Sequence, residues 1–172
     1  FLASSGGIAP LAAARGLGAA DLEDLRQRRN ALYQAHLEQQ PLTIPGVRET
    51  LAALRPRFAM GIVTSSRRDH FATIHRRTGL LEFFDFVLTS EDYAESKPAP
   101  DPYLAGIART GFAPSECVAI EDAPRGLAAA SAAGIDCWVI PTPLSRRADF
   151  SGAKRLLRDV TEIADTLLAR SG

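Results

Sequence analysis

Two short polar segments of the chain contain residue types that bind phosphate or a divalent cation. The hydroxyl-rich segment Thr64-Ser65-Ser66 and the acidic pair Glu121-Asp122 each follow a short apolar run. Hydroxyls and backbone N–H groups at a turn before a helix suit an anion, because a helix N-terminus presents unpaired donors. Two adjacent carboxylates repel each other unless a cation or a basic group lies nearby, and such oxygen ligands suit Mg²⁺.

A third polar segment, 96–102, is stiffened by three prolines and contains Lys97, one of only two lysines in the chain. A lysine on a rigid loop can serve as a fixed point charge for phosphate or carboxylate. Each segment also has a purely structural interpretation. Thr64 and Asp122 are residue types that commonly cap helices, and Glu121 and Lys97 would then be solvated surface residues. The residues by themselves leave both interpretations open.

The elements that must position these residues alternate between short apolar runs and helical patterns. Four apolar runs predict strands, and five patterns predict the helices before, between and after them: strands 58–63, 84–88, 117–120 and 137–140, and helices 47–54, 69–78, 101–110, 124–133 and 154–170. Strands separated by helices indicate βα units, and hence an α/β fold with a Rossmann-like parallel sheet flanked by helices. Ligands of such sheets bind beyond the carboxyl ends of the strands, which is where the polar segments are expected to lie.

Residues 1–41 read as a separate helical part. The pattern predicts a short helix at 9–17 and a longer one at 22–39 with Asp21 as its N-cap. Two prolines and a glycine within 40–46 break the pattern and indicate a linker. We therefore expect two parts, 1–41 and 42–172.

Composition narrows the possible functions. The 172 residues are 46% hydrophobic, and 20 basic residues balance 20 acidic ones. A net charge of zero gives no general attraction to nucleic acid or to anionic lipid. There is no apolar run of about 18 residues, so we expect no membrane-spanning helix. Cys117 and Cys137 form no CxxC pair and lie in apolar runs, which fits buried reduced thiols in a cytoplasmic protein.

The order of the polar segments resembles that of the haloacid dehalogenase-like hydrolase superfamily, especially its phosphatase and β-phosphoglucomutase-like branch. The matching stretches are GIVTSS at 61–66, SKPAPDPY at 96–103 and VAIEDAPRGLAAASAAG at 118–134. The resemblance implies a core of this family's fold at 42–172 and the remainder of a helical cap at 1–41. It also implies a Mg²⁺-dependent phosphatase or phosphomutase that acts on a small phosphorylated metabolite through an aspartyl-phosphate.

The resemblance implies a role for each matching residue. Thr64 corresponds to the hydroxyl that hydrogen-bonds the transferring phosphoryl group, with the backbone N–H of Ser65 beside it. Lys97 corresponds to the lysine that neutralises charge between the nucleophile and the phosphoryl oxygens. Asp122 corresponds to a Mg²⁺ ligand, and Glu121 to a neighbouring ligand that binds directly or through water. These roles agree with phosphoryl transfer, which needs positioning and charge neutralisation above all.

Other expectations concern the substrate and the nucleophile. Ser66, Arg67 and Arg125 lie close in sequence to the polar turns and are candidates for substrate contact, although arginines at such positions are often solvated. The family's nucleophile belongs to a DxD motif at the end of an N-terminal strand, and no such segment is found in the chain. We expect this strand to precede Phe1 and to lie between the strands at 58–63 and 117–120.

Two alternative functions stay open at this stage. A catalytically inactive or truncated binding protein of the same family fits the absent nucleophile. A 2-haloacid dehalogenase displaces halide from carbon and needs no metal, so the adjacent Glu121-Asp122 pair argues against it.

Overall fold

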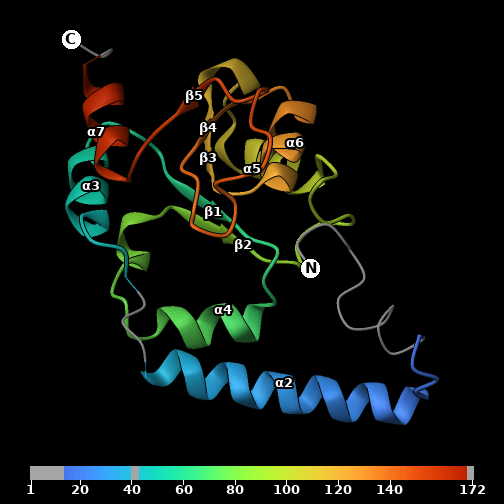
Figure 1. Cartoon of the computed structure of the whole chain (residues 1–172). Helices are drawn as coiled ribbons and strands as arrows, with labels where there is room; N and C mark the ends of the chain where they lie inside the picture. The colour runs from blue at the N-terminus through green and yellow to red at the C-terminus, as the bar shows by residue number, and fades with distance from the viewer. Residues whose placement is uncertain (1–13, 40–42, 170–172) are drawn as a thin grey trace. The chain divides into compact units, whose positions relative to one another are not determined.

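The computed structural model describes residues 14–39 and 43–169 of the chain (Figure 1). They belong to two compact units, 1–42 and 43–172. In the first unit, helix α2 spans Ala19–Gln39. The prediction that Asp21 is its N-cap is wrong, because the helix begins two residues earlier and Asp21 lies in its first turn. From there its carboxylate accepts a hydrogen bond from the backbone N–H of Gly18 at 2.9 Å. The helix predicted at 9–17 lies mostly outside the described residues, and its described part at 14–16 is a turn.

The second unit contains two parallel sheets. Strand β1 (Gly61–Val63) pairs with β2 (Phe86–Leu88) in one sheet. In the other, β3 (Val118–Glu121), β4 (Asp136–Val139) and β5 (Arg155–Leu156) are adjacent in that order. All described strand pairs are parallel. The α/β class and the four predicted strands are therefore confirmed, with each strand at most four residues long.

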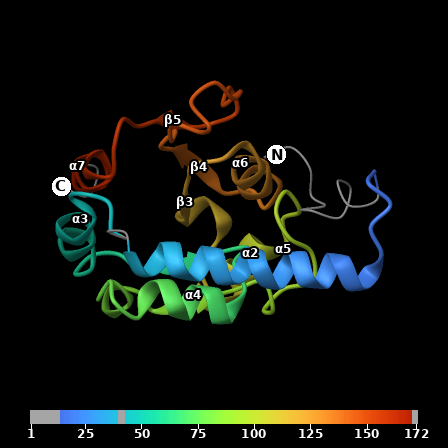
Figure 2. The same cartoon turned by 60° about the horizontal axis from the view of Figure 1, so that its bottom comes forward.

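Helices flank both sheets of this unit. Their bounds are α3 Val47–Leu54, α4 Arg68–His75, α5 Asp101–Thr110, α6 Pro124–Ala132 and α7 Thr161–Leu168, with single 3₁₀ turns η1 at Leu81–Phe83 and η2 at Pro114–Glu116. Helix α5 packs against β1 and β2, and α6 packs against β3 and β4. Helices α3 and α7 lie side by side in both views (Figures 1 and 2). None of the helices in the described part of the chain is long and apolar enough to cross a membrane.

Strand β4 is covered on both faces, as parallel sheets require. The side chains of Cys137 and Val139 are buried in one apolar cluster, and Trp138 between them is buried in a second cluster on the other side. This alternation follows from the two-residue period of a strand. The two clusters hold the carboxyl ends of β3 and β4 rigidly, and these ends carry part of the site described below.

The described residues 154–169 do not form the single helix that the pattern of 154–170 predicts. Arg155 and Leu156 form strand β5, which is extended by a hydrogen bond from Leu157 N to Val139 O at 2.9 Å. Helix α7 begins only at Thr161, whose backbone N–H donates to Asp159 at 2.9 Å. This segment pairs with the edge of β4 that β3 leaves free. A strand of two residues is too short to show an alternating pattern in the sequence.

Candidate functional site

A cavity of about 680 Å³ lies at the carboxyl ends of β1 and β3. The predicted residues that line it are Thr64, Ser65, Lys97, Glu121, Asp122 and Arg125. The rest of its wall is formed mainly by apolar side chains, among them Val63, Ile120 and Ile163, and also by the polar residues Thr142, Arg158 and Asp159. Three segments that lie far apart in the sequence therefore meet at one place, as expected for the carboxyl edge of a parallel sheet.

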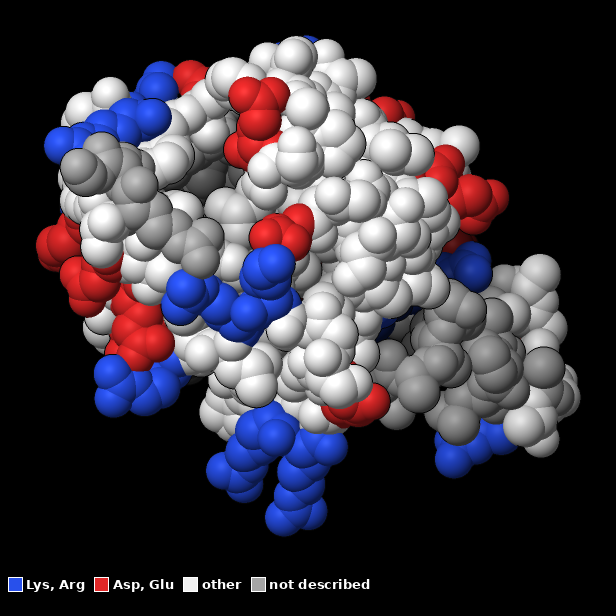
Figure 3. Space-filling view, turned by 90° about the horizontal axis from the view of Figure 1, so that it is seen from above, with Lys and Arg blue, Asp and Glu red and all other residues white. Residues whose placement is uncertain are grey.

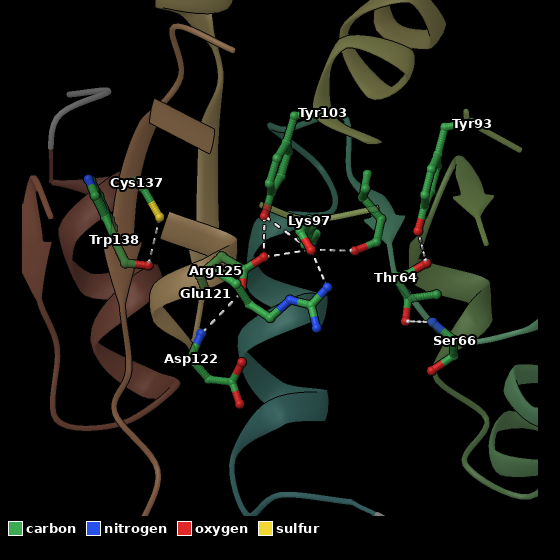
Figure 4. Close-up of polar contacts among 11 residues, drawn as sticks. Thr64, Ser66, Tyr93, Lys97, Tyr103, Glu121, Asp122, Arg125, Cys137 and Trp138 are labelled. Atoms are coloured by element: carbon green, nitrogen blue, oxygen red, sulfur yellow. Dashed lines mark hydrogen bonds and ion pairs between the residues drawn. The ribbon is translucent and has the colours of Figure 1, made fainter. Parts of the chain in front are cut away.

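Lys97 is a buried residue of the loop between β2 and α5, so the alternative of a solvated surface lysine is wrong. Its side chain is only 10% exposed. Its ammonium group donates to Val63 O at 3.0 Å and to Glu121 Oε1 at 2.5 Å, and lies 3.4 Å from the hydroxyl of Tyr103 (Figure 4). The lysine thus connects the end of β1, the end of β3 and helix α5.

Glu121, the last residue of β3, is likewise not a solvated carboxylate. Its side chain is 8% exposed, and its Oε1 accepts hydrogen bonds from Lys97 and from the hydroxyl of Tyr103. A Cβ atom at Gly126 would collide with this carboxylate, so a larger residue would have to displace Glu121. The negative charge of Glu121 is therefore compensated inside the protein, which is what a buried carboxylate requires.

The turn after β1 is held by backbone and side-chain hydrogen bonds. Thr64 N donates to Leu88 O at 2.9 Å, and Thr64 Oγ1 accepts from Ser66 N at 3.1 Å. The hydroxyl of Tyr93 donates to Thr64 O at 2.7 Å. Thr64 does not cap α4, whose N-cap is Arg67 without a side-chain hydrogen bond. The turn is thus fixed with the Thr64 and Ser65 residues at the cavity wall.

Asp122 faces the cavity directly after β3. The N-cap of α6 is Ala123, with no side-chain hydrogen bond, so Asp122 does not cap this helix. Burial raises the pKa of Asp122 above its ordinary value, and the charge of Glu121 adds to the rise. A cation beside this carboxylate would favour its charged form and so offset the effects of burial and of the Glu121 charge.

The residues of the cavity fit a Mg²⁺ ion in part. Among the described residues there is no group of three or more His, Cys, Asp or Glu side chains that could hold a metal. Mg²⁺ is usually bound through one or two carboxylates, with waters and substrate phosphate completing its shell. Asp122 offers one such hard oxygen ligand, whereas Oε1 of Glu121 is already engaged by Lys97 and Tyr103.

The three candidates for substrate contact have different surroundings. Arg125 lines the cavity, and its guanidinium donates to the backbone carbonyl of Lys97 (Figure 4). Arg67 does not line the cavity and forms an ion pair with Asp69 at 3.2 Å, in which its side chain is 67% exposed. Ser66 is also outside the lining, and its carbonyl accepts from Ser90 N at 3.0 Å. Of the three, only Arg125 lines the cavity, whereas Ser66 contacts Thr64 through its backbone N–H outside the lining.

Sequence reasoning missed Tyr103, Tyr93 and Gly126. Tyr103 falls inside the proline-rich stretch that drew attention to Lys97, and a buried phenol must find a hydrogen-bond partner. That signal was available, since Tyr103 lies at the start of the helical pattern of 101–110. The role of Gly126 depends on the approach of Glu121 across the β3–α6 turn, and nothing in the local sequence indicates that approach.

Charge on the surface shows no single-sign patch on the face drawn in Figure 3, where basic and acidic side chains are interspersed. The charges that matter for the site are inside the cavity instead. Fold and site together define an α/β protein in which a lysine, a hydroxyl turn and a carboxylate pair meet at the carboxyl ends of parallel strands.

The family model of the haloacid dehalogenase-like hydrolases matches residues 12–140, and the chain belongs to this family. The chain is 34% identical over 123 residues to the validoxylamine A 7'-phosphate phosphatase of Streptomyces hygroscopicus subsp. limoneus. This alignment covers 71% of this chain and 57% of that protein. It is 33% identical over 124 residues to the fructose-1-phosphate phosphatase YqaB of Escherichia coli (strain K12), covering 70% and 64%. The chain thus spans less than two thirds of either phosphatase.

Solved structures give the same assignment. The crystal structure of CbbY from Rhodobacter sphaeroides in complex with phosphate superimposes with a TM-score of 0.73 at 27% identity, covering 86% of this chain and 68% of that one. A putative β-phosphoglucomutase from Thermotoga maritima gives a TM-score of 0.67 at 28% identity, covering 73% and 60%. The predicted resemblance to the phosphatase and β-phosphoglucomutase-like branch is confirmed.

Proposed function

We propose that the protein is a Mg²⁺-dependent phosphoryl-transfer hydrolase, a phosphatase or phosphomutase, which acts on a small phosphorylated metabolite through an aspartyl-phosphate. The observation that supports this most strongly is the meeting of Thr64, Lys97 and Asp122 around one cavity. The names of the similar phosphatases, which specify fructose 1-phosphate and validoxylamine A 7'-phosphate, support a small phosphate ester as the substrate.

The proposed roles follow from what each group can do. The Thr64 hydroxyl and the Ser65 backbone N–H hydrogen-bond the phosphoryl oxygens at the turn after β1. The Lys97 ammonium neutralises the charge that builds up between the nucleophile and the phosphoryl group. Preorganised donors of this kind stabilise the transition state because they need no rearrangement during the reaction.

We propose Asp122 as the residue that binds Mg²⁺. Glu121 beside it would contribute either through a water ligand of the metal or through its ion pair with Lys97. When bound, the metal supplies positive charge that allows a carboxylate to approach a phosphate. The raised pKa of Asp122, caused by burial and by the charge of Glu121, supports the binding of a cation beside this carboxylate.

The nucleophile is not assigned to any described residue. Among these residues, β1 and β3 each pair on one side only, and Val63 and Ile120 from them line the cavity between the sheets. We propose that a strand carrying the DxD motif pairs there and brings the nucleophile to Lys97. In this proposal 1–41 is the remainder of a helical cap and 42–172 is the core.

The cysteines fit the proposed cytoplasmic location. Cys117 and Cys137 are both free thiols, and Cys137 is buried as expected whereas Cys117 is only half-buried. Burial raises the pKa of Cys137 to about 12, with the charge of Glu121 adding to the rise. Such a thiol stays protonated and unreactive at neutral pH.

The proposal is tested by trapping the phosphorylated protein. The full natural protein is mixed with a small sugar phosphate and Mg²⁺, quenched in acid and analysed by peptide mass spectrometry. We expect one phosphoryl group on an aspartate, removed by hydroxylamine as acyl phosphates are. Transfer of this phosphoryl group to a second sugar phosphate rather than to water would identify a mutase.

Two outcomes would assign one of the alternatives. Equilibrium binding of the sugar phosphate without any phosphoprotein or phosphate release would indicate a catalytically inactive binding protein. Release of halide from a 2-haloacid without added metal would indicate a dehalogenase. Either result would overturn the proposed phosphoryl transfer.

A further inference from the structure

Tyr103 places a phenol hydroxyl at the centre of the buried ion pair. The residue lies in the first turn of α5 and is 8% exposed. Its hydroxyl donates to Glu121 Oε1, the same oxygen that accepts from Lys97 (Figure 4). A hydrogen bond to an ionised acceptor is roughly twice as strong as one between neutral groups. Tyr103 is therefore well suited to fix the Glu121 carboxylate.

The ammonium group of Lys97 is held by three acceptors from three different elements. They are Val63 O at 3.0 Å, Glu121 Oε1 at 2.5 Å and Tyr103 Oη at 3.4 Å. An ammonium has three N–H donors, so all of them are used. The contact with Tyr103 is the longest, and the ring of Tyr103 adds a cation–π contact with Nζ 4.8 Å from its centroid. Tyr103 thus holds Lys97 partly through its ring and partly through Glu121.

Glu121 has little freedom to turn away from this arrangement. Its carboxylate packs against Gly126 and occupies the space that a Cβ atom would need there. Its side chain is only 8% exposed, so water cannot easily replace a lost donor. Removal of the Tyr103 hydroxyl therefore leaves Lys97 as the main partner of Glu121 Oε1. The Lys97–Glu121 ion pair is then held by fewer contacts and can change its position.

We propose that Tyr103 is a positioning residue that sets the location of the Lys97 ammonium, acting through the Glu121 carboxylate and through its own ring. Its effect on the rate rests on the proposed function, because a displaced ammonium neutralises the phosphoryl group less well. The location of the ammonium itself is a property of the chain and is measurable without any reaction.

The chain offers a direct probe of Lys97, since its only other lysine is Lys154. The side chain of Lys97 is 10% exposed and that of Lys154 is 57% exposed. Acetylation of the full chain with a limiting amount of an N-hydroxysuccinimide ester, followed by peptide mass spectrometry, reports both lysines in one sample. Lys154 serves as the internal standard for reagent concentration, and circular dichroism of each variant controls for global unfolding.

Tyr103→Phe removes the hydroxyl and retains the ring. We expect the acetylation rate of Lys97 to rise at least about threefold with that of Lys154 unchanged, because one N–H donor is released and its pairing with Glu121 loosens. Tyr93→Phe is the matched control, since it removes a phenol hydrogen bond from Thr64 O and leaves the contacts of Lys97 intact. It should leave the acetylation rate of Lys97 at the parent value.

The kinetic measurement separates positioning from a merely structural role. In the natural protein we expect Tyr103→Phe to lower kcat about tenfold with KM within about twofold, since the interaction lost acts on the transition state. Tyr103→Leu, which also removes the ring, should lower kcat further and expose Lys97 more. If Tyr103→Phe failed to fold, the same comparison would be made between the parent and Tyr103→Leu.

The acetylation and the kinetic measurements can each contradict one proposal without deciding the other. An unchanged acetylation rate of Lys97 in Tyr103→Phe and Tyr103→Leu would overturn the positioning role, whatever the kinetics show. A raised rate of Lys97 in a protein that forms no phosphoenzyme would support the positioning role and refute the proposed function. A raised KM with unchanged kcat would show that Tyr103 serves binding, which also contradicts the proposal.

Discussion

Glu121 is the residue on which the charged groups of the cavity depend most. It accepts hydrogen bonds from Lys97 and Tyr103 and packs against Gly126. The pair that it forms with Lys97 is buried, with both side chains 10% exposed or less. Loss of one partner from a buried pair leaves an uncompensated charge, which costs far more than the pair contributes.

The first prediction compares the two lysine ion pairs of the chain. Glu121→Gln should lower the free energy of unfolding by about 3 kcal/mol, because Lys97 stays buried without a counter-charge. Asp136→Asn is the control, since Asp136 pairs with Lys154 at 3.6 Å with both side chains more than half exposed. It should cost less than about 1 kcal/mol. Urea unfolding measures the free energy of unfolding of both variants. Equal losses would contradict the claim that Glu121 and Lys97 form a buried ion pair.

The second prediction concerns the glycine that faces this carboxylate. Gly126→Ala should lower the free energy of unfolding by about 1–3 kcal/mol, since the new Cβ must displace Glu121 in a packed site. The gain in helix propensity of up to about 1 kcal/mol offsets part of this loss. Gly152→Ala is the control, because a Cβ there would meet only Leu127 Cδ2 at 4.0 Å. A stabilised Gly126→Ala protein would refute the close approach.

Residue types and their order were enough to find most of the cavity-lining polar residues. Thr64 and the Glu121-Asp122 pair stand out because they directly follow apolar runs, and Lys97 because it is one of only two lysines and lies in a proline-rich loop. Tyr103 and Gly126 were missed because their importance comes from contacts across the fold. Arg67 was a poorer candidate than Arg125, and only the structure separates an exposed ion pair from a guanidinium bound to the lysine loop.

At the scale of elements, Arg48 connects α3 to the corner that follows α4. Its guanidinium donates to Gly79 O at 2.8 Å and to Thr78 O at 3.3 Å, and pairs with Glu82 at 2.8 Å. It also lies 5.4 Å from the ring centroid of Phe83. The planar guanidinium satisfies several acceptors at once, which a lysine does not do.

The third prediction follows from this connection. Arg48→Ala should lower the free energy of unfolding by about 1–2 kcal/mol, and Arg48→Lys should recover less than half of the loss. Arg57→Ala, at an exposed position after α3, should stay within about 0.5 kcal/mol of the parent. Thermal unfolding monitored by circular dichroism measures all three. Full recovery by lysine would show that only the charge matters.

The fourth prediction uses the last residue of α4. Burial lowers the pKa of His75 from its ordinary value of 6.5. The folded protein therefore prefers the neutral ring, and the stability that this preference contributes is present above pH 6.5 and declines as the pH falls below it. His75→Gln should lose less stability than the parent between pH 7 and pH 5, which urea unfolding at the two pH values measures. An NMR titration of His75 with a midpoint above 6.5 would contradict the sign.

The element pattern was predictable where the strands are apolar and separated by full helices. Strands β1 to β4 and helices α3 to α6 follow the expected order. Strand β5 was not predictable, because two residues carry no period and their pairing is decided by the free edge of β4. The early start of α2 at Ala19 reflects a cap in which Asp21 reaches back to Gly18 N.

For the molecule as a whole, Lys97 joins the two sheets of the second unit. It donates to the last residue of β1, Val63, and to the last residue of β3, Glu121. The described strands β1 and β3 form no hydrogen-bonded pair with each other, and the cavity lies between their ends. The same ammonium group that the proposed reaction uses is thus also a cross-link between the sheets.

The central claim is that this cavity performs phosphoryl transfer with Lys97 as its cation. The most direct measurement is the release of inorganic phosphate from a panel of small sugar phosphates by the natural protein with and without Mg²⁺. Release should depend on Mg²⁺ and fall at least about a hundredfold in Lys97→Met, while Lys154→Met, the control at the other lysine, should retain the parental rate. Equal rates in the two variants, both folded by circular dichroism, would contradict the claim.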